Sequence, residues 1–458
     1  MSFPRYPEYR DSGVEWLGEV PEHWRQGTIR RLVESVRNGT TSDQVDMSEA
    51  TVPVSRIETI SMGNIDFERV GHTPYSAGLE RYRLSKGDIL FSHINSLSMI
   101  GNAAIYEDDR VLIHGMNLLR ICPMRGVVSK WLWYWLTSVN IRREVESRAK
   151  PAINQASIST GSVQDLPALI PPSNEQQKIA QFLDHETAKI DALIQEQQRL
   201  IELLKEKRKA VISHAVTKGL DPSVPMKDSG VEWLGEGPEH WRVMKFVRCV
   251  QIAEGQVDPK ISPYSEMALI APNHVEPGTG RLIAIETSEE QGAESGKYVC
   301  EAGNVIYSKI RPALRKVCLA PVDCLCSADM YPLDATNGLS NQYLLWVILS
   351  EPFSVLAVLE SERVAMPKIN REALNEVFLA VPPENEQDVI GHYVSDTVAR
   401  LDRLLSESLS SITYLNERRS ALISAAVTGK IDVRNWKPPA NESAFNGEVR
   451  QAGLEVAS

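Results

Sequence analysis

The run DSGVEWLGEVPEHW at residues 11–24 recurs as DSGVEWLGEGPEHW at residues 228–241, with thirteen of fourteen positions identical. Chance does not produce such a match, so the chain contains two copies of one unit. Weaker matches follow in the same order along both copies. They are GDILFS at 87–92 with GNVIYS at 303–308, PAIN at 151–154 with PKIN at 367–370, PPSNEQQKI at 171–179 with PPENEQDVI at 382–390, KIDALI at 189–194 with RLDRLL at 400–405, and KRKAVISHAVT at 207–217 with RRSALISAAVT at 418–428.

Each copy consists of a mixed segment followed by a long helix. The mixed segments combine short β-rich runs, such as 88–91 and 305–307, with apolar helical stretches. A Pro-Pro pair precedes each expected helix, and a glycine ends it. The expected capping residue is Asn174 or Ser173 in the first copy and Asn385 in the second. The expected segments are a mixed domain at 1–170, a helix at 171–220, a second mixed domain at 221–381, a second helix at 382–430 and a flexible tail at 431–458.

Apolar residues recur every seven positions in both expected helices. The repeating residues are Leu183, Ile190, Gln197, Leu204 and Val211 in the first, and Val394, Leu401, Ser408, Leu415 and Leu422 in the second. A period of 3.5 predicts a coiled-coil seam, with a polar interruption at Gln197 and Ser408. A parallel pair would force the second domain to span the whole helix, so we expect an antiparallel one. The predicted fold class is α+β: two homologous mixed α/β domains separated by two long antiparallel coiled-coil helices, with pseudo-two-fold symmetry.

Composition and charge restrict the possible functions. The 458 residues, 43% of them hydrophobic, suffice for two or three folded domains. The formal net charge of -11 argues against strong nucleic-acid binding by the whole surface. The acidic excess lies mainly in residues 221–377, which hold 14 basic and 22 acidic side chains, so a DNA footprint is expected only as a local patch.

The sequence also indicates a compartment. Its longest apolar run, 343–349, is far shorter than the ~20 residues of a membrane helix. Charged residues are frequent among the first twenty, which argues against a signal peptide. The six scattered cysteines are expected to be reduced thiols. We therefore expect a cytoplasmic protein without membrane association.

Catalytic signatures are missing from the sequence. The run 292–298 resembles a phosphate-binding loop, but its spacing is one residue short and Tyr298 stands where Ser or Thr should reach magnesium. There is no nucleophile elbow, no zinc-protease motif and no pair of cysteines at metal-ligand spacing. No catalytic or metal-binding residue is therefore assigned.

Together these residues resemble the specificity subunits of Type I restriction-modification enzymes. The resemblance is carried by the duplicated EWLGE-PEHW run, by LSKGDILFS at 84–92, by the PPxNEQ start of both helices and by the ISHAVTKG and ISAAVTGK helix ends. It extends from about residue 9 to 432 and includes the order domain, helix, domain, helix.

The resemblance implies a subunit without catalytic activity. Each mixed domain would read one half of a split double-stranded DNA target, and the helices would set the spacer between the halves. Two methyltransferase (M) subunits would dock, flip out one adenine each and methylate it, and restriction and motor (R) subunits would cleave unmodified DNA. S-adenosylmethionine, ATP and Mg²⁺ are therefore expected on the partner subunits, and no cofactor on this chain.

Candidate DNA contacts follow the two matching strand runs that end at residues 92 and 308. The first is followed by small polar side chains that suit base edges, and the second by the most basic stretch of an acidic domain. The alternative is a solvated loop in the first domain and a charge-balancing surface in the second. The predicted DNA-binding residues are Ser92, His93, Asn95, Ser96 and Ser98 in the first domain and Ser308, Lys309, Arg311, Arg315 and Lys316 in the second.

The tryptophans of the repeated run have another expected role. Residues that read different sequences should differ between the copies, whereas these are the same in both. We therefore expect packing anchors rather than base-stacking platforms. They are Trp16, Trp24, Trp233 and Trp241.

Two other functions remain open at this point. One is a coiled-coil scaffold that binds only protein, which predicts no sequence-dependent DNA contact even with partners present. The other is a self-contained restriction or modification enzyme, against which the missing motifs argue.

Overall fold

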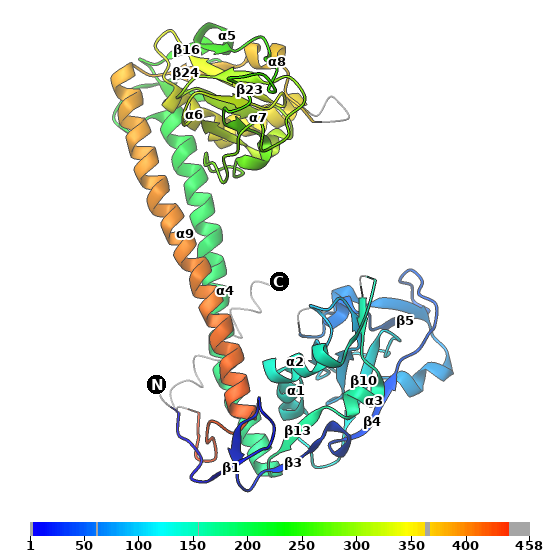
Figure 1. Cartoon of the computed structure of the whole chain (residues 1–458). Coiled ribbons are helices and arrows are strands. Elements are labelled where there is room, and N and C mark those ends of the chain that lie inside the picture. The colour runs from blue at the N-terminus through cyan, green and yellow to red at the C-terminus, as the bar shows by residue number, and fades with distance from the viewer. Residues whose placement is uncertain (1–2, 61–62, 154, 362–366, 439–458) are drawn as a thin grey trace. The chain divides into compact units, whose positions relative to one another are not determined.

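The computed structural model describes residues 3–60, 63–153, 155–361 and 367–438 (Figure 1). The chain divides into two compact units, unit 1 (residues 1–196 and 411–458) and unit 2 (residues 197–410). Each unit contains one mixed α/β head and a part of both long helices. The long helices are α4 (Ser173–Lys218) and α9 (Glu384–Val427).

Each head has its own central sheet, and the two sheets have the same strand order. In unit 1 four antiparallel strands lie in the order β4 (Val33–Asn38), β10 (Leu118–Pro123), β7 (Ile89–Ser92) and β9 (Ala103–Ile105). In unit 2 the corresponding order is β17 (Val250–Ile252), β23 (Met330–Ala335), β20 (Val305–Ser308) and β21 (Val317–Leu319). The expected strands at 88–91 and 305–307 are thus equivalent central strands of the two heads.

An apolar helix belongs to the core of each head. These helices are α1 (Ser129–Thr137) and α6 (Asn341–Leu349), both largely buried as the sequence predicts. The other elements of unit 1 are β1 (Tyr9–Asp11), β2 (Glu19–Pro21), β3 (Arg25–Thr28), β5 (Thr51–Val54), β6 (Gly71–Pro74), β8 (Ile94–Asn95), β11 (Lys150–Ala152), β12 (Gln155–Ser157), β13 (Pro167–Ile170), α2 (Val139–Arg148) and α3 (Thr160–Gln164). Those of unit 2 are β14 (Met226–Asp228), β15 (Glu236–Pro238), β16 (Arg242–Lys245), β18 (Leu269–Ile270), β19 (Tyr298–Cys300), β22 (Cys324–Cys326), β24 (Phe378–Val381), α5 (Phe246–Cys249), α7 (Glu351–Ser361) and α8 (Arg371–Glu376).

A glutamate in the first turn of each long helix, buried at Glu175 and half-buried at Glu386, bonds to the repeated EHW run. In unit 1 the carboxylate of Glu175 accepts hydrogen bonds from the Trp24 indole Nε1 (2.9 Å), the Tyr6 hydroxyl (3.0 Å) and His23 Nε2 (2.7 Å). The positive end of the helix dipole also favours a carboxylate at this position. The two most similar segments of the repeat are therefore bonded to each other.

Unit 2 repeats this arrangement. Glu386 accepts hydrogen bonds from the Trp241 Nε1 (3.0 Å) and from His240 Nε2 (2.8 Å). Trp24 and Trp241 are both buried, as the expectation of packing anchors requires.

The glutamine that follows each glutamate ties the helix start to the head. Gln176 donates to the Pro171 carbonyl (2.9 Å) and accepts from the Val128 amide (3.0 Å) just before α1. Its counterpart Gln387 donates to the Pro382 carbonyl (2.9 Å) and accepts from the Ser340 amide (2.9 Å), which precedes α6. The PPxNEQ run thus fixes the position of the buried helix of each head relative to α4 or α9.

The C-terminal end of each long helix packs against the tryptophan run that is bonded to the start of the other long helix. Gly429 follows α9 with a φ of 77°, and a Cβ atom there would lie 2.4 Å from Cδ of Pro21. Gly219 follows α4 with a φ of 75° and lies against Trp241. Both positions require glycine, because of the left-handed backbone and, at Gly429, the close approach as well.

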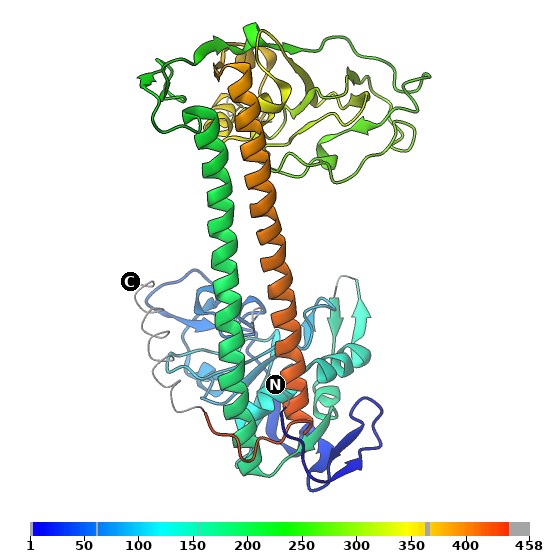
Figure 2. The same ribbon diagram turned by 90° about the vertical axis from the view of Figure 1, so that its left-hand side faces the viewer.

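Within each unit, α4 and α9 run antiparallel (Figure 2). In unit 1 the end of α9 lies beside the start of α4, and further along Asp191 pairs with Arg419 (2.8 Å). In unit 2 the end of α4 lies beside the start of α9, and Arg208 pairs with Asp402 (3.2 Å). The predicted heptad residues are all buried or half-buried, as a seam requires; Ser408 is buried and Gln197 half-buried.

Two expectations from the sequence are wrong. Residues 431–438 were expected to belong to a flexible tail, but Ile431 and Val433 are buried and the Trp436 ring lies 5.5 Å from that of Phe182. These apolar side chains complete the core of unit 1. The rest of the expected tail, residues 439–458, lies outside the described residues.

The second error concerns the pairing of PAIN at 151–154 with PKIN at 367–370. The Ile369 amide donates to the Lys309 carbonyl (3.0 Å), and the Ile158 amide donates to the equivalent carbonyl of His93 (2.9 Å). Hence the structural counterpart of residues 367–370 is residues 156–159. A match of four residues is too short to align the two copies correctly. The hydrogen bonds to the carbonyls of His93 and Lys309 give the correct alignment.

The glutamate network generates a prediction about stability. Glu175→Ala leaves buried donors of Trp24 and Tyr6 unpaired, and each unpaired buried donor costs about 1–3 kcal/mol. We expect amide hydrogen exchange measured by mass spectrometry to accelerate in unit 1, whereas the matched, more exposed Glu386→Ala should have a smaller effect confined to unit 2. Glu175→Gln, which retains one acceptor oxygen, should lose less protection. Unchanged exchange in Glu175→Ala would contradict this role.

His114 generates a prediction about pH. It is buried in head 1, donates to the Leu118 carbonyl (2.8 Å), and burial lowers its pKa from the usual 6.5 to about 4. The unfolded chain therefore takes up a proton first as the pH falls, so stability decreases from pH 6.5 toward pH 4, by roughly 3 kcal/mol at most. His114→Gln should reduce this decrease in thermal unfolding followed at pH 7 and pH 5. Parallel pH profiles of the two proteins would refute the assignment.

Candidate nucleic-acid interface

In head 1 the loop after β7 presents small polar groups. Asn95 donates to the Ser92 hydroxyl (3.1 Å) and accepts from the Ser96 amide (2.8 Å), while the hydroxyls of Ser96 and Ser98 lie 3.1 Å apart. Asn95 and Ser96 are half-buried and Ser98 is exposed. These amide and hydroxyl groups have the donor and acceptor chemistry that base edges require.

The first two predicted residues of this loop lie inside the head. Ser92 is the last residue of the buried strand β7, and His93 is also buried. Burial lowers the pKa of His93, so the neutral imidazole is favoured. Of the five predicted residues in head 1, only Asn95, Ser96 and Ser98 are accessible for direct contact with DNA. Ser92 and His93 are buried beneath this loop.

A hairpin that the sequence analysis did not select lies beside this loop. Strands β11 and β12 pair with each other, and β12 pairs with β8 through Ala156 opposite Asn95. At its tip Ile153 is 94% exposed, next to the exposed Lys150 and Pro151. Proteins that bind the minor groove often insert an exposed apolar side chain of this kind between base steps. No local sequence motif marks this hairpin as a DNA contact.

In head 2 the five predicted residues fall into different environments. Ser308 is the buried end of β20. Lys309 lies with its ammonium 5.2 Å from the centre of the Tyr331 ring. Arg315 pairs with Glu351 (2.8 Å), and Lys316 donates to the Pro272 carbonyl (2.5 Å).

Of these five residues, Arg311 has the side chain that is most accessible to DNA. It is exposed, and its guanidinium makes no hydrogen bond or ion pair within the described residues. Its backbone is left-handed (φ 47°), as is that of Arg315 (φ 47°), on either side of the short helical turn Pro312–Leu314. Such a backbone costs roughly 1–2 kcal/mol in a residue with a Cβ, and strained residues cluster at functional sites. The loop is held by the hydrogen bond from the Arg311 amide to the Pro367 carbonyl (3.0 Å).

Further basic residues join this loop from elsewhere in the sequence. Ile310 forms a β-bridge with Lys368, which is exposed. The Arg371 guanidinium lies 5.3 Å from the centre of the same Tyr331 ring that Lys309 approaches. A basic cluster therefore forms within the most acidic part of the chain. The sequence indicated only Lys309 and Arg311 of this cluster, because Lys368 and Arg371 lie more than fifty residues later in the chain.

The described residues contain no group of three or more His, Cys, Asp or Glu side chains that could hold a metal ion. No single described helix is long and apolar enough to cross a membrane. The bent pair α6 and α7 passes the same test jointly, by length and composition only.

Comparisons with known proteins identify relatives of one kind. The sequence profile of the Type I restriction modification DNA specificity domain matches residues 21–203. A protein of Methanocaldococcus jannaschii named as the specificity subunit of the MjaX type I restriction enzyme is 28% identical over 436 residues, which cover 91% of this chain and 96% of the relative. The EcoDI specificity subunit of Escherichia coli is 29% identical, over 70% of this chain and 74% of its own length.

Solved structures share the architecture. A chain from work on complex assembly and conformational transition of the type I R-M system superposes with a TM-score of 0.68 at 14% identity, covering 89% of this chain and 98% of that one. The HsdS subunit from Thermoanaerobacter tengcongensis superposes with a TM-score of 0.52 at 14% identity, covering 90% and 98%. At these identities the structural matches establish the fold.

Proposed function

We propose that each head of this chain reads one half of a split DNA target. The chain belongs to the specificity subunits of Type I restriction-modification systems. The chain is the DNA-recognition subunit of such a system. The observation that carries the proposal is that equivalent strands, β7 and β20, lead into loops of different chemistry. A conserved support with divergent loops suits the recognition of two different sequences.

The two heads would use different contacts. In head 2 the guanidinium of Arg311 suits bidentate recognition of a guanine, with Lys309 and Lys368 near the phosphates. In head 1 Asn95, Ser96 and Ser98 would bond to base edges, and Ile153 would enter the groove beside them.

Catalysis would belong to partner subunits. Methyltransferase subunits would carry S-adenosylmethionine, and restriction subunits would use ATP and Mg²⁺, in the cytoplasm. Exposed apolar residues on the long helices, among them Leu200, Leu203, Leu404 and Leu409, support protein docking on this surface. Partner subunits would also supply many phosphate contacts, which accounts for the acidic balance of this chain.

The test of this function is adenine methylation across a genome. A host that expresses this chain with the methyltransferase subunit of its system should gain methylation at one split motif, and the host without this chain should not. No new methylation, despite an assembled complex, would favour the protein-binding scaffold. Methylation by this chain alone would favour a self-contained enzyme.

Arg311 gives a residue-level prediction. Arg311→Ala should relax the methylated motif at positions of one half-site and leave the other half unchanged, since loss of a bidentate guanine contact costs about 1–3 kcal/mol of discrimination. The measurement is sequencing of methylated adenines. Arg248→Ala removes another exposed arginine of unit 2 and should leave the motif intact. An unchanged motif in Arg311→Ala would exclude this loop as a reader of bases.

A further inference from the structure

The two arginine–aspartate pairs across the long helices are equivalent in the repeat. The alignment of 189–194 with 400–405, and of 207–217 with 418–428, matches Asp191 to Asp402 and Arg208 to Arg419. Each pair therefore joins the same two positions of the helix seam, once in unit 1 and once in unit 2.

In unit 2 a loop of head 2 covers this pair. Arg208 donates through Nη1 to the Gly278 carbonyl (2.6 Å) and through Nη2 to the Thr279 carbonyl (3.1 Å), and through Nε to Asp402. The side chains of Arg208 and Asp402 are only 10% and 11% exposed. The buried guanidinium is thus satisfied by two main-chain carbonyls and one carboxylate.

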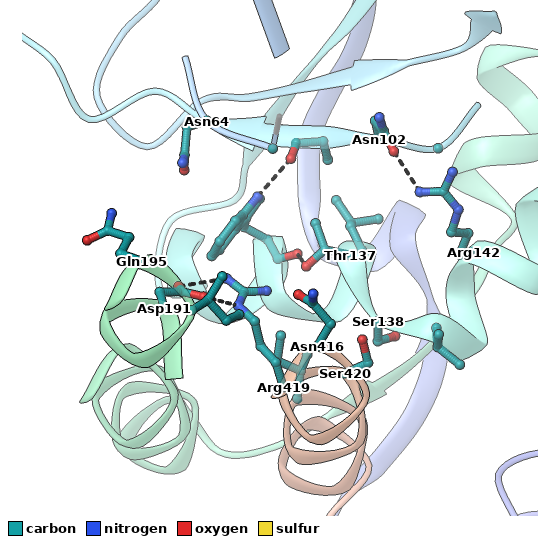
Figure 3. Close-up of a pocket in the computed structure, with 18 residues that line it drawn as sticks. Asn64, Asn102, Thr137, Ser138, Arg142, Asp191, Gln195, Asn416, Arg419 and Ser420 are labelled. Carbon is teal, nitrogen blue, oxygen red and sulfur yellow. Dashed lines mark hydrogen bonds and ion pairs between the residues drawn. The ribbon is translucent and has the colours of Figure 1, made fainter. Parts of the chain in front are cut away.

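In unit 1 the same pair is open. The side chains of Arg419 and Asp191 are 31% and 47% exposed, and Arg419 bonds to Asp191 through Nε and Nη2. Within the described part of the chain its Nη1 has no hydrogen-bond partner. The pair lines a pocket of about 800 Å³ in unit 1, shown in Figure 3.

The loops of the two heads differ in length. In head 2 the loop is closed by the hydrogen bond from the Ile283 amide to the His274 carbonyl (2.9 Å), and in head 1 the counterpart runs from the Asp66 amide to the Thr59 carbonyl (2.9 Å). The loop of head 1 is therefore shorter by two residues. Its residue Asn64 forms part of the pocket wall but makes no hydrogen bond to Arg419 among the described contacts.

The lining indicates what kind of group the pocket takes. Both arginines in it already face carboxylates, Arg419 at Asp191 (2.8 Å) and Arg142 at Glu146 (3.4 Å). Neutralised cations attract phosphate weakly, whereas neutral amide and hydroxyl groups suit peptide groups. Such groups make up most of the remaining polar lining, namely Asn64, Asn102, Thr137, Ser138, Gln195, Asn416 and Ser420.

We propose that this pocket of unit 1 binds a turn of a partner polypeptide, which presents main-chain carbonyls to Arg419 as Gly278 and Thr279 present theirs to Arg208. Under the proposed function, on which this inference rests, the partner is a methyltransferase subunit. Unit 2 fills the equivalent position with its own loop, so the two units would hold their partners unequally.

The experiment uses the full chain assembled with methyltransferase subunits and target DNA. The photo-crosslinking residue p-benzoylphenylalanine replaces Asn416, which lines the pocket. We expect a crosslink to one turn of the methyltransferase polypeptide. Arg419→Gln should reduce its yield roughly tenfold, the loss expected for a hydrogen bond to a charged group. The matched control Arg418→Gln, at the exposed neighbouring arginine, should leave the yield unchanged.

Three outcomes would overturn the inference while leaving the proposed function intact. They are a crosslink to DNA alone, no crosslink in a complex that assembles and methylates, and a crosslink that Arg419→Gln does not weaken. Failure of the chain to assemble with any methyltransferase subunit would overturn both. Assembly is measured on the same samples by size-exclusion chromatography, so the two failures are distinguishable.

Discussion

The structure depends on a carboxylate at the start of each long helix, buried at Glu175 and half-buried at Glu386. Glu175 and Glu386 each accept the indole N–H of a buried tryptophan from the run that precedes the head in sequence. A buried carboxylate is costly unless several donors satisfy it. Here those donors come from a segment some 150 residues away, so the network closes the head and orients the helix at the same time.

The sequence repeat and the spatial units divide the chain differently. The helix pair of unit 1 combines the start of α4, from the first copy, with the end of α9, residues 411–427, from the second copy. Gly219 and Gly429 show why: each ends one helix against the tryptophan motif that anchors the other. The most similar segments of the two copies, the tryptophan run and the helix ends, are those at which one copy contacts the other. The heads, which lie between these segments in the sequence, differ much more.

Patterns of short range predicted the fold well. The heptads and the proline and glycine boundaries indicated both long helices, and the strand runs at 88–91 and 305–307 indicated one strand of each central sheet. The site was predictable only in part, because burial at the end of a strand depends on tertiary packing, which placed Ser92, His93 and Ser308 inside. Ile153, Lys368 and Arg371 join the interface through strand pairing and ring contacts, and no local sequence signal reports those.

The two ends of the described chain meet in unit 1. The Asp432 amide donates to the Pro4 carbonyl (2.8 Å), and the rings of Phe3 and Trp436 both contact Phe182. Since each helix also ends where the other begins, the succession of segments is effectively circular. A chain opened after Gly219 and joined between residues 438 and 3 would keep the same succession of segments around this circle. A chain permuted in this way would keep the contacts at both helix ends, whereas a new head 2 would also have to replace the Gly278 and Thr279 carbonyls that bond to Arg208 in the helix seam.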